Sequence, residues 1–247
     1  DKGAFSAAST LSTDGGEIAL QGRLDTRSEA YGIELRCDSF PLNSFLPADS
    51  LGLLDLALQA GGSGFDPLRA QTRGNIRLQV DRAEFRGRDF GGVKLNANLE
   101  GGQLSGRLSD RDEALRLLLL ISGTLTERKQ EVRLTGNVFD FDLAELGISP
   151  QKIGGSFALE AGASASDAGS YTARIALDSI EVRTRHRTDR IRPTSLSLSS
   201  DTTATRAKLA SGDLSLAFVS PGPVDSLVPA LTRSTDILAQ QLPLIHI

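Results

Sequence analysis

The feature that most constrains this chain is an alternation of apolar and polar residues that continues through nearly its whole length. In residues 91–109, GGVKLNANLEGGQLSGRLS, an apolar residue stands at every second position from Val93 to Leu99, and the pattern resumes after a Gly-Gly pair. A period of two sends successive side chains to opposite faces of a β-strand. We therefore expect an all-β protein whose sheet has one apolar face.

About fourteen segments share this pattern, and the joints between them are short and rich in Gly, Asp, Asn and Ser. Joints of this length connect neighbouring antiparallel strands, because parallel strands need long crossovers. The sequence thus predicts a long antiparallel meander with strands near residues 16–24, 30–38, 52–60, 69–81, 93–99, 103–109, 113–125, 130–138, 154–162, 170–178, 180–186, 194–200, 204–210 and 213–219.

Three segments depart from the alternation. FPLNSFLP (40–47) and FDLAELGISP (141–150) are typical of short helical turns that end at proline. Beyond residue 223, Leu227, Leu231 and Leu238 share one face at helical spacing, which predicts an amphipathic C-terminal helix. Such a helix caps the last strands or, alternatively, docks on the apolar surface.

The chain also contains an internal repeat. Phe40 and Phe141 open the two short helical segments 101 residues apart, and the same offset pairs Leu58 with Leu159. A constant offset over about a hundred positions indicates two copies of one unit, with coincidence between evenly spaced strands as the alternative. We predict a first β-groove unit at residues 1–101, a second at residues 102–219, and a helix with its tail at residues 220–247.

Composition and motifs argue against several classes of protein. The net charge is −4 and only 5% of residues are aromatic, so a nucleic-acid partner is not expected. The sequence has one cysteine and two histidines, and it lacks HExxH, CxxC and G-x-S-x-G motifs. We therefore expect a protein that is not an enzyme and binds no metal or cofactor. Cys37 lies on the apolar side of its strand, as a small buried residue would.

One basic run stands out in RTRHRTDRIRP (183–193), where Arg183, Arg185 and Arg187 share one parity. These arginines fit a solvated hairpin tip. They also fit a contact with lipid phosphates or an acidic partner, because guanidinium groups bind such oxygens in pairs.

An apolar face of this length can be covered by a sandwich, closed into a barrel or curled into a trough. The face is mostly Leu, Ile, Val and Ala, without the aromatic anchors of a sandwich core, and such a surface suits hydrocarbon tails. We expect these residues to line a lipid groove: Ile18, Leu20, Ile33, Leu35, Leu54, Leu56, Leu58, Ile76, Leu78, Val80, Val93, Leu95, Leu99, Leu134, Val138, Phe157, Leu159, Ile175 and Leu177.

The repeated units, FPLNSFLPADSLGLLDLALQAGG and FDLAELGISPQKIGGSFALEAGA, resemble the AsmA-like family, and within it the translocation and assembly module proteins (TamB). The resemblance implies a periplasmic segment folded as a β-taco, a long sheet curled into a hydrophobic groove. It further implies a parent protein anchored in the inner membrane outside this segment, and movement of phospholipid between inner and outer membranes in support of outer-membrane biogenesis. An outer-membrane barrel protein of the assembly family is the implied partner. The family has no catalytic residues to carry over.

Two other functions fit the same sequence. One is a scaffold for outer-membrane protein assembly or translocation that holds partner strands at the sheet edges. The other is a structural β-repeat stalk with a sealed core. A conduit needs an open apolar surface, a scaffold needs unpaired sheet edges, and a stalk needs a closed core.

Overall fold

The computed structural model describes residues 3–45, 51–166 and 169–223, which form one 16-stranded antiparallel sheet. Fourteen strands follow one another along the sheet in chain order, and the two short strands β6 and β13 pair with β5 and β12 beside this path. The sheet is open, with β1 and β16 at its two ends. The predicted all-β meander is therefore confirmed.

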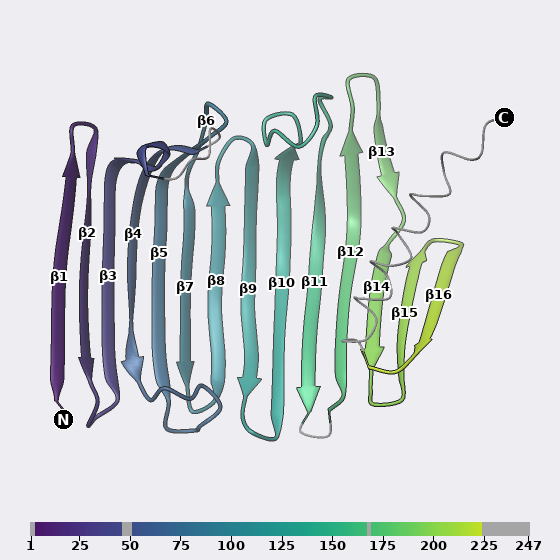
Figure 1. The fold of residues 1–247 in the computed structure, drawn as a ribbon. Coiled ribbons are helices and arrows are strands. Elements are labelled where there is room, and N and C mark those ends of the chain that lie inside the picture. The colour runs from purple at the N-terminus through teal and green to yellow at the C-terminus, as the bar shows by residue number, and fades with distance from the viewer. Residues whose placement is uncertain (1–2, 46–50, 167–168, 224–247) are drawn as a thin grey trace, which may run out of the picture.

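The strands are long for a globular protein and run side by side across the molecule (Figure 1). Their bounds are β1 Ala4–Thr13, β2 Gly16–Asp25, β3 Ala30–Pro41, β4 Leu51–Ser63, β5 Arg73–Phe85, β6 Arg88–Phe90, β7 Val93–Glu100, β8 Gln103–Arg111, β9 Leu115–Leu125, β10 Lys129–Asp142, β11 Gly154–Ser166, β12 Tyr171–Arg183, β13 Thr188–Ile191, β14 Thr194–Ser200, β15 Ala204–Ser211 and β16 Leu214–Pro221.

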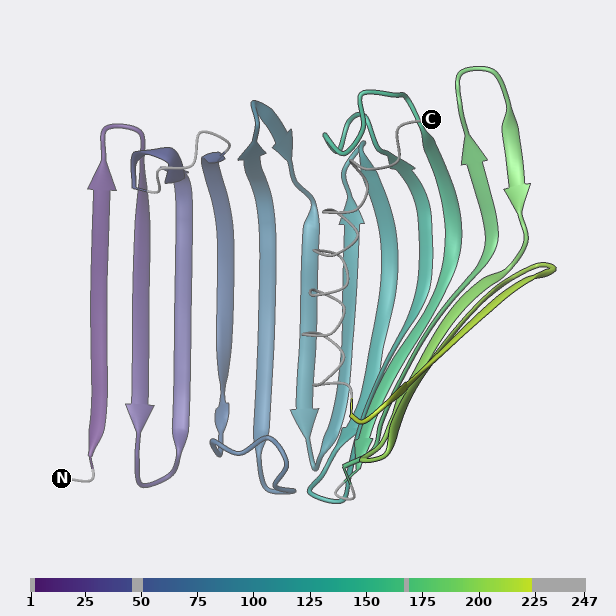
Figure 2. The same ribbon diagram turned by 45° about the vertical axis from the view of Figure 1, so that its right-hand side comes forward.

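The sheet changes direction along its length. In Figure 2 the strands from β1 to β5 stand nearly upright, whereas those from β11 to β16 lean and turn out of the plane of the earlier strands. A right-handed twist between neighbouring strands accumulates in this way across a wide sheet. The twist leaves both faces of the sheet continuous from β1 to β16.

The strand predictions were wrong in two ways: one strand was predicted as two, and β1, β6 and β13 were missed. Residues 170–178 and 180–186 were expected to form separate strands, but β12 runs through both as far as Arg183. Ser179 has a φ of 51°, and the pairing with β11 shifts register between Ser156 and Ala158. A β-bulge of this kind changes which residues face the apolar side, so the alternation looked interrupted. Strand β1 was not predicted, because its Ala, Ser and Thr residues alternate only weakly.

The predicted short helical turns are not seen as such. The described part of the first segment, residues 40–45, contains a three-residue 3-10 turn, Leu42–Ser44. In the second segment, residues 143–147 form successive turns after β10. In the second segment Gly147 has a φ of 70°, and the N–H groups of Ile148 and Ser149 both donate to the Leu143 carbonyl. These bonds close the first turn and prevent a helix from continuing. The predicted C-terminal helix lies outside the described residues.

The order of elements repeats along the sheet. Strands β2 to β8 and β9 to β15 each contain a long bulged strand, a turn segment, two further long strands, a short side strand and two final strands. The bulge in β3 lies between Cys37 and Phe40, and the bulge in β10 lies 101 residues later, between Val138 and Phe141. The predicted domain boundary after residue 101 falls in the turn between β7 and β8, within the continuous sheet.

Little of the described chain is buried. Five apolar side chains form its buried core, namely Cys37, Phe40, Ala114, Leu119 and Val138. The accessible surface is 16588 Å², whereas a compact protein of 26.2 kDa would expose about 10,600 Å². Aromatic contacts gather near the bulges, where Phe40 stacks on Phe45 at 5.0 Å and Phe141 lies 6.0 Å from Phe157. The sheet is therefore held together mainly by pairing between neighbouring strands.

Two glycines on the apolar face test this view of the sheet. A Cβ atom at Gly136 would lie 2.0 Å from the Leu118 carbonyl oxygen, whereas a Cβ atom at Gly22 would meet nothing within 4 Å. We expect Gly136→Ala to lower the free energy of unfolding by about 1–3 kcal/mol, since the backbone of two strands must move apart. Gly22→Ala should leave it unchanged or raise it by about 0.5 kcal/mol. Urea unfolding of both variants measures the difference, and equal effects would contradict the close approach of β9 and β10.

Candidate functional site

The centre of the apolar face is a row of leucines that crosses the sheet from strand to strand. Each member is the direct register partner of the next, and directly opposed residues share a face. The row runs through Leu20, Leu35, Leu58, Leu78, Leu95, Leu108, Leu119, Gly136, Leu159 and Leu177. Gly136 is the one position in it without a side chain.

Further apolar rows flank the leucine row on both sides. The row below it contains Ile, Leu, Ala and Gly and runs through Gly22, Ile33, Ala60, Ile76, Ala97, Gly106, Ile121, Leu134, Ala161, Ile175, Leu196, Leu209 and Leu216. Above it lie Ile18, Cys37, Leu56, Val80 and Val93, followed beyond β8 by Leu117, Val138 and Phe157.

All the residues that were expected to line a groove lie on this one face. Leu56 and Leu78 are partly buried, whereas Gln59 and Arg77 on the opposite parity are exposed, as the alternation predicts. Leu108, Leu119 and Ile121 belong to the same face but were not among the residues expected to line the groove. For β9 the reason is that LRLLLLIS has apolar residues at both parities, so its sequence does not show which set of side chains lies on the apolar face.

The apolar face is open to solvent over much of its area. Ile33, Ile76 and Ile175 are 45%, 43% and 45% exposed, and Leu20 is 46% exposed. The buried apolar side chains of the three rows are Cys37 and Val138 near the bulges and Leu119 in the leucine row. Monomeric soluble proteins rarely leave such wide apolar surfaces uncovered, and those that do use them for binding.

One carboxylate lies on the apolar face. Asp110 occupies the row above the leucines, opposite Leu117, and is only 8% exposed. Burial raises the pKa of its carboxyl above the usual range, although the N–H of Asp112 donates to it at 2.9 Å. Asp112 in turn accepts from the N–H groups of Gly91 and Ala114. These bonds fix the loop that joins β8 to β9.

The three arginines predicted as a headgroup or partner contact lie at the end of β12 and in the turn before β13, but ion pairs neutralise most of their charge. Arg183 ends β12 and pairs with Asp140 of β10, which Arg116 also approaches at 3.4 Å. Arg187 pairs with Asp189 at 2.7 Å. Arg185 lies in the exposed turn before β13, where Thr184 accepts and donates the closing hydrogen bonds. This geometry supports the hairpin tip over a binding site.

The two edge strands of the sheet carry no charged residue. β1 (AFSAASTLST) pairs with β2 over ten residues without a register shift, and its other edge has no neighbour among the described strands. β16 (LSLAFVSP) ends the sheet at the other side with Leu214, Leu216 and Phe218 exposed. Proteins usually protect edge strands with Lys, Pro or bulges, because a bare edge can pair with another strand.

Other functional features are sparse in the described part of the chain. His186 is exposed in the turn after β12, and no group of three or more metal-binding side chains occurs in that part. Within the same residues, no helix is long and apolar enough to cross a membrane. No protein-family model, no curated protein and no solved structure matches the chain.

The buried carboxylate gives a test of the apolar face. Because the pKa of Asp110 is higher in the folded than in the unfolded state, the folded state holds its proton more tightly. Its contribution to stability is therefore lost as pH rises from the ordinary carboxyl range through the raised pKa. We expect Asp110→Asn to melt at a higher temperature than the parent at pH 7.5, with the gap narrowing as pH falls toward 4.

The matched control is Asp38→Asn, which removes a carboxylate from an exposed position of β3. A gap between Asp110→Asn and the parent that does not change with pH would contradict a buried, uncompensated charge at Asp110.

Proposed function

We propose that the apolar sheet face binds the acyl chains of phospholipids and that the protein is a conduit segment for lipid between two membranes. The observation that supports this most is the set of apolar rows that cross from β2 to β12, many of whose side chains stay partly exposed. A surface of Leu, Ile and Ala offers no hydrogen bonds, so it suits hydrocarbon chains and selects little among them.

The dimensions support a path rather than a pocket. The fourteen strands of the main path, at about 4.8 Å between neighbours, give a sheet about 60 Å wide. Each CH₂ group moved from water onto an apolar surface gains up to about 0.8 kcal/mol, so a bound acyl chain is held without any polar contact. The same non-directional attraction lets the chain slide from one row position to the next.

The resemblance to AsmA-like proteins extends this proposal to the cell. In that setting the sheet is a β-taco segment of the periplasm, within a larger protein anchored in the inner membrane. Its lipid passes to the outer membrane, and an outer-membrane barrel protein of the assembly family is the proposed partner. The curled groove of that family would place the acyl chains against the leucine row.

A second candidate function is a scaffold that holds strands of outer-membrane proteins. The uncharged, unbulged edge of β1 favours it, since an extended partner strand can add to such an edge through main-chain hydrogen bonds. A stalk with a sealed core receives less support, because only five apolar side chains of the described residues are buried.

A charge in the leucine row tests the conduit. Leu78 and Leu95 are register partners in the middle of β5 and β7, and both are only partly buried. We expect Leu78→Asp to remain folded, with a loss of about 1–2 kcal/mol, because its carboxylate can stay hydrated on an open face. A lipid chain that passes it must instead remove that water. Crosslinking from a photoreactive residue at position 95 should therefore yield phospholipid adducts in the parent and far fewer in Leu78→Asp.

The matched control is Asn96→Asp, which places the same charge on the polar face opposite Arg77 and should leave crosslinking unchanged. A folded Leu78→Asp protein that forms as many lipid adducts as the parent would contradict the conduit. A parent that yields no lipid adduct at position 78 or 95 would favour the scaffold. In that case a photoreactive residue on the edge strand β1 should form adducts with partner protein strands.

A further inference from the structure

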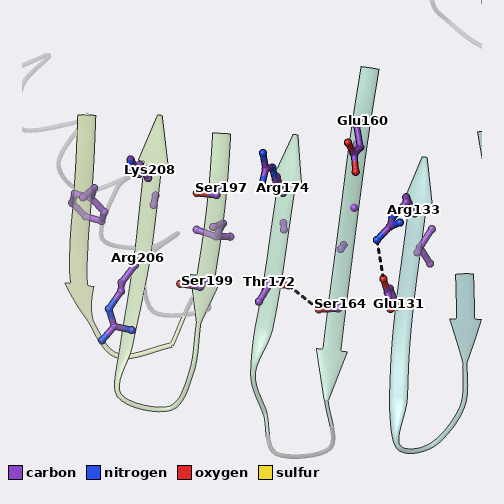
Figure 3. A pocket seen from close by; sticks show the side chains of 18 of the residues that line it. Glu131, Arg133, Glu160, Ser164, Thr172, Arg174, Ser197, Ser199, Arg206 and Lys208 are labelled. Atoms are coloured by element: carbon purple, nitrogen blue, oxygen red, sulfur yellow. Dashed lines mark hydrogen bonds and ion pairs between the residues drawn. The ribbon is translucent and has the colours of Figure 1, made fainter. Parts of the chain in front are cut away.

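The polar face of the sheet carries a hollow of its own. It measures about 620 Å³ and extends from β10 to β16, on the side away from the leucine row. Figure 3 shows charged and hydroxyl side chains of β10, β11, β12, β14 and β15 gathered around it. Ala217 and Val219 of β16 line it from the same face, whereas other apolar residues of its lining, such as Ala161 and Leu198, belong to the opposite face by their register.

Register brings three cations of distant sequence into one row across this hollow. Arg133 faces Gly162, which faces Arg174, and Arg174 faces Ser197, which faces Lys208. Figure 3 shows Arg174, Ser197 and Lys208 at a common height on β12, β14 and β15. Arg174 and Lys208 are two strands apart, a separation of about 10 Å between their backbones. Two long side chains at that distance can close on one group held above Ser197.

The adjoining row completes a block of hydrogen-bond donors. Thr172 faces Ser199, and Ser199 faces Arg206. The six polar residues that β12, β14 and β15 contribute to the hollow are thus three cations and three hydroxyls, without a carboxylate: Thr172, Arg174, Ser197, Ser199, Arg206 and Lys208.

Nearby carboxylates leave most of this positive charge uncompensated. Glu131 of β10 is held by Lys129 at 2.6 Å and Arg133 at 3.5 Å, and Glu160 lies on β11 outside the block. Asp201 approaches Arg206 at 3.6 Å, but its carboxylate is already bonded by the Thr203 hydroxyl and by the N–H groups of Thr203 and Ala204. These bonds lower the pKa of Asp201 to about 2. In the described part of the chain, Arg174 and Lys208 form no ion pair with a carboxylate.

We propose that this block binds a phosphate group, which sits over Ser197 between Arg174 and Lys208. A tetrahedral phosphate offers several acceptor oxygens in different directions, and it can accept from a guanidinium, an ammonium and two hydroxyls together. A carboxylate has only two oxygens, which lie in one plane, so it fits donors that converge from several directions less well. The group belongs either to a soluble phosphate compound or to a phospholipid headgroup. This site does not rest on the lipid conduit, because the sheet separates the two faces.

Isothermal titration calorimetry at low salt tests the site with three probes: inorganic phosphate, dihexanoylphosphatidic acid below its aggregation concentration, and the dicarboxylate malonate. The double variant Arg174→Gln/Lys208→Gln removes two cations of the block. We expect the parent to bind at least one phosphate probe more tightly than malonate, and the double variant to bind that probe about tenfold more weakly or worse. Tight binding of phosphatidic acid alone identifies a headgroup, whereas equal binding of both phosphate probes identifies the phosphate group itself.

The matched control is Arg77→Gln/Lys94→Gln, which removes the same charge from exposed positions of β5 and β7 on the same face. The affinity of this variant for the phosphate probes should stay within about twofold of the parent, since positions 77 and 94 lie many strands from the block. The proposal is wrong if the control loses as much affinity as Arg174→Gln/Lys208→Gln. It is also wrong if malonate binds as tightly as phosphate, or if the parent binds neither phosphate probe. Circular dichroism melting of all variants verifies that each is folded.

Discussion

The structure depends on one constraint, the register of its antiparallel backbone ladder. In each neighbouring pair from β2 to β9, the direct partner of a leucine in the central row is another leucine. A slip of one residue in any pair would send that strand's apolar side chains to the polar face. Because the sheet is a single layer in the described residues, no second layer exists there to correct such a slip. The pairing itself must therefore specify the faces.

The same constraint explains why the sheet buries few apolar side chains and leaves many of them exposed. Side chains touch their neighbours along each row, but the far side of the apolar face stays open, as the exposure of Ile33 and Ile175 demonstrates. Burial is concentrated at the bulged ends of β3 and β10, where Phe40 and Val138 are covered. The two faces then offer different chemistry. One attracts hydrocarbon without direction, and the other holds directed donors such as Arg174 and Ser197.

Much of the fold could be predicted from the sequence because alternation over so many segments is compatible with few folds besides a one-sided sheet. The alternation predicted the antiparallel meander correctly, and all the residues that it assigned to the apolar face lie on one face of the sheet. It failed where the alternation is weak or broken. The small residues of β1 gave little signal, β9 is apolar at both parities, and the bulge at Ser179 made β12 look like two strands. Arg183, Arg185 and Arg187 share a parity in sequence, but they do not form one site. Arg183 pairs with Asp140 at the end of β12, and Arg187, in the following turn, pairs with Asp189.

By itself, the sequence determined that strands would form, that they would be antiparallel, and which residues of most strands would share a face. These properties follow from local periodicity and from short joints, which are readable without any contact between distant residues. Only the tertiary structure decided which distant residues meet. Arg133, Arg174 and Lys208 come from three separate strands, and their common row depends on the sum of several turns and bulges between them. Each bulge adds one residue to one strand and shifts every later pairing, so the position of this row is fixed by geometry that alternation alone does not record.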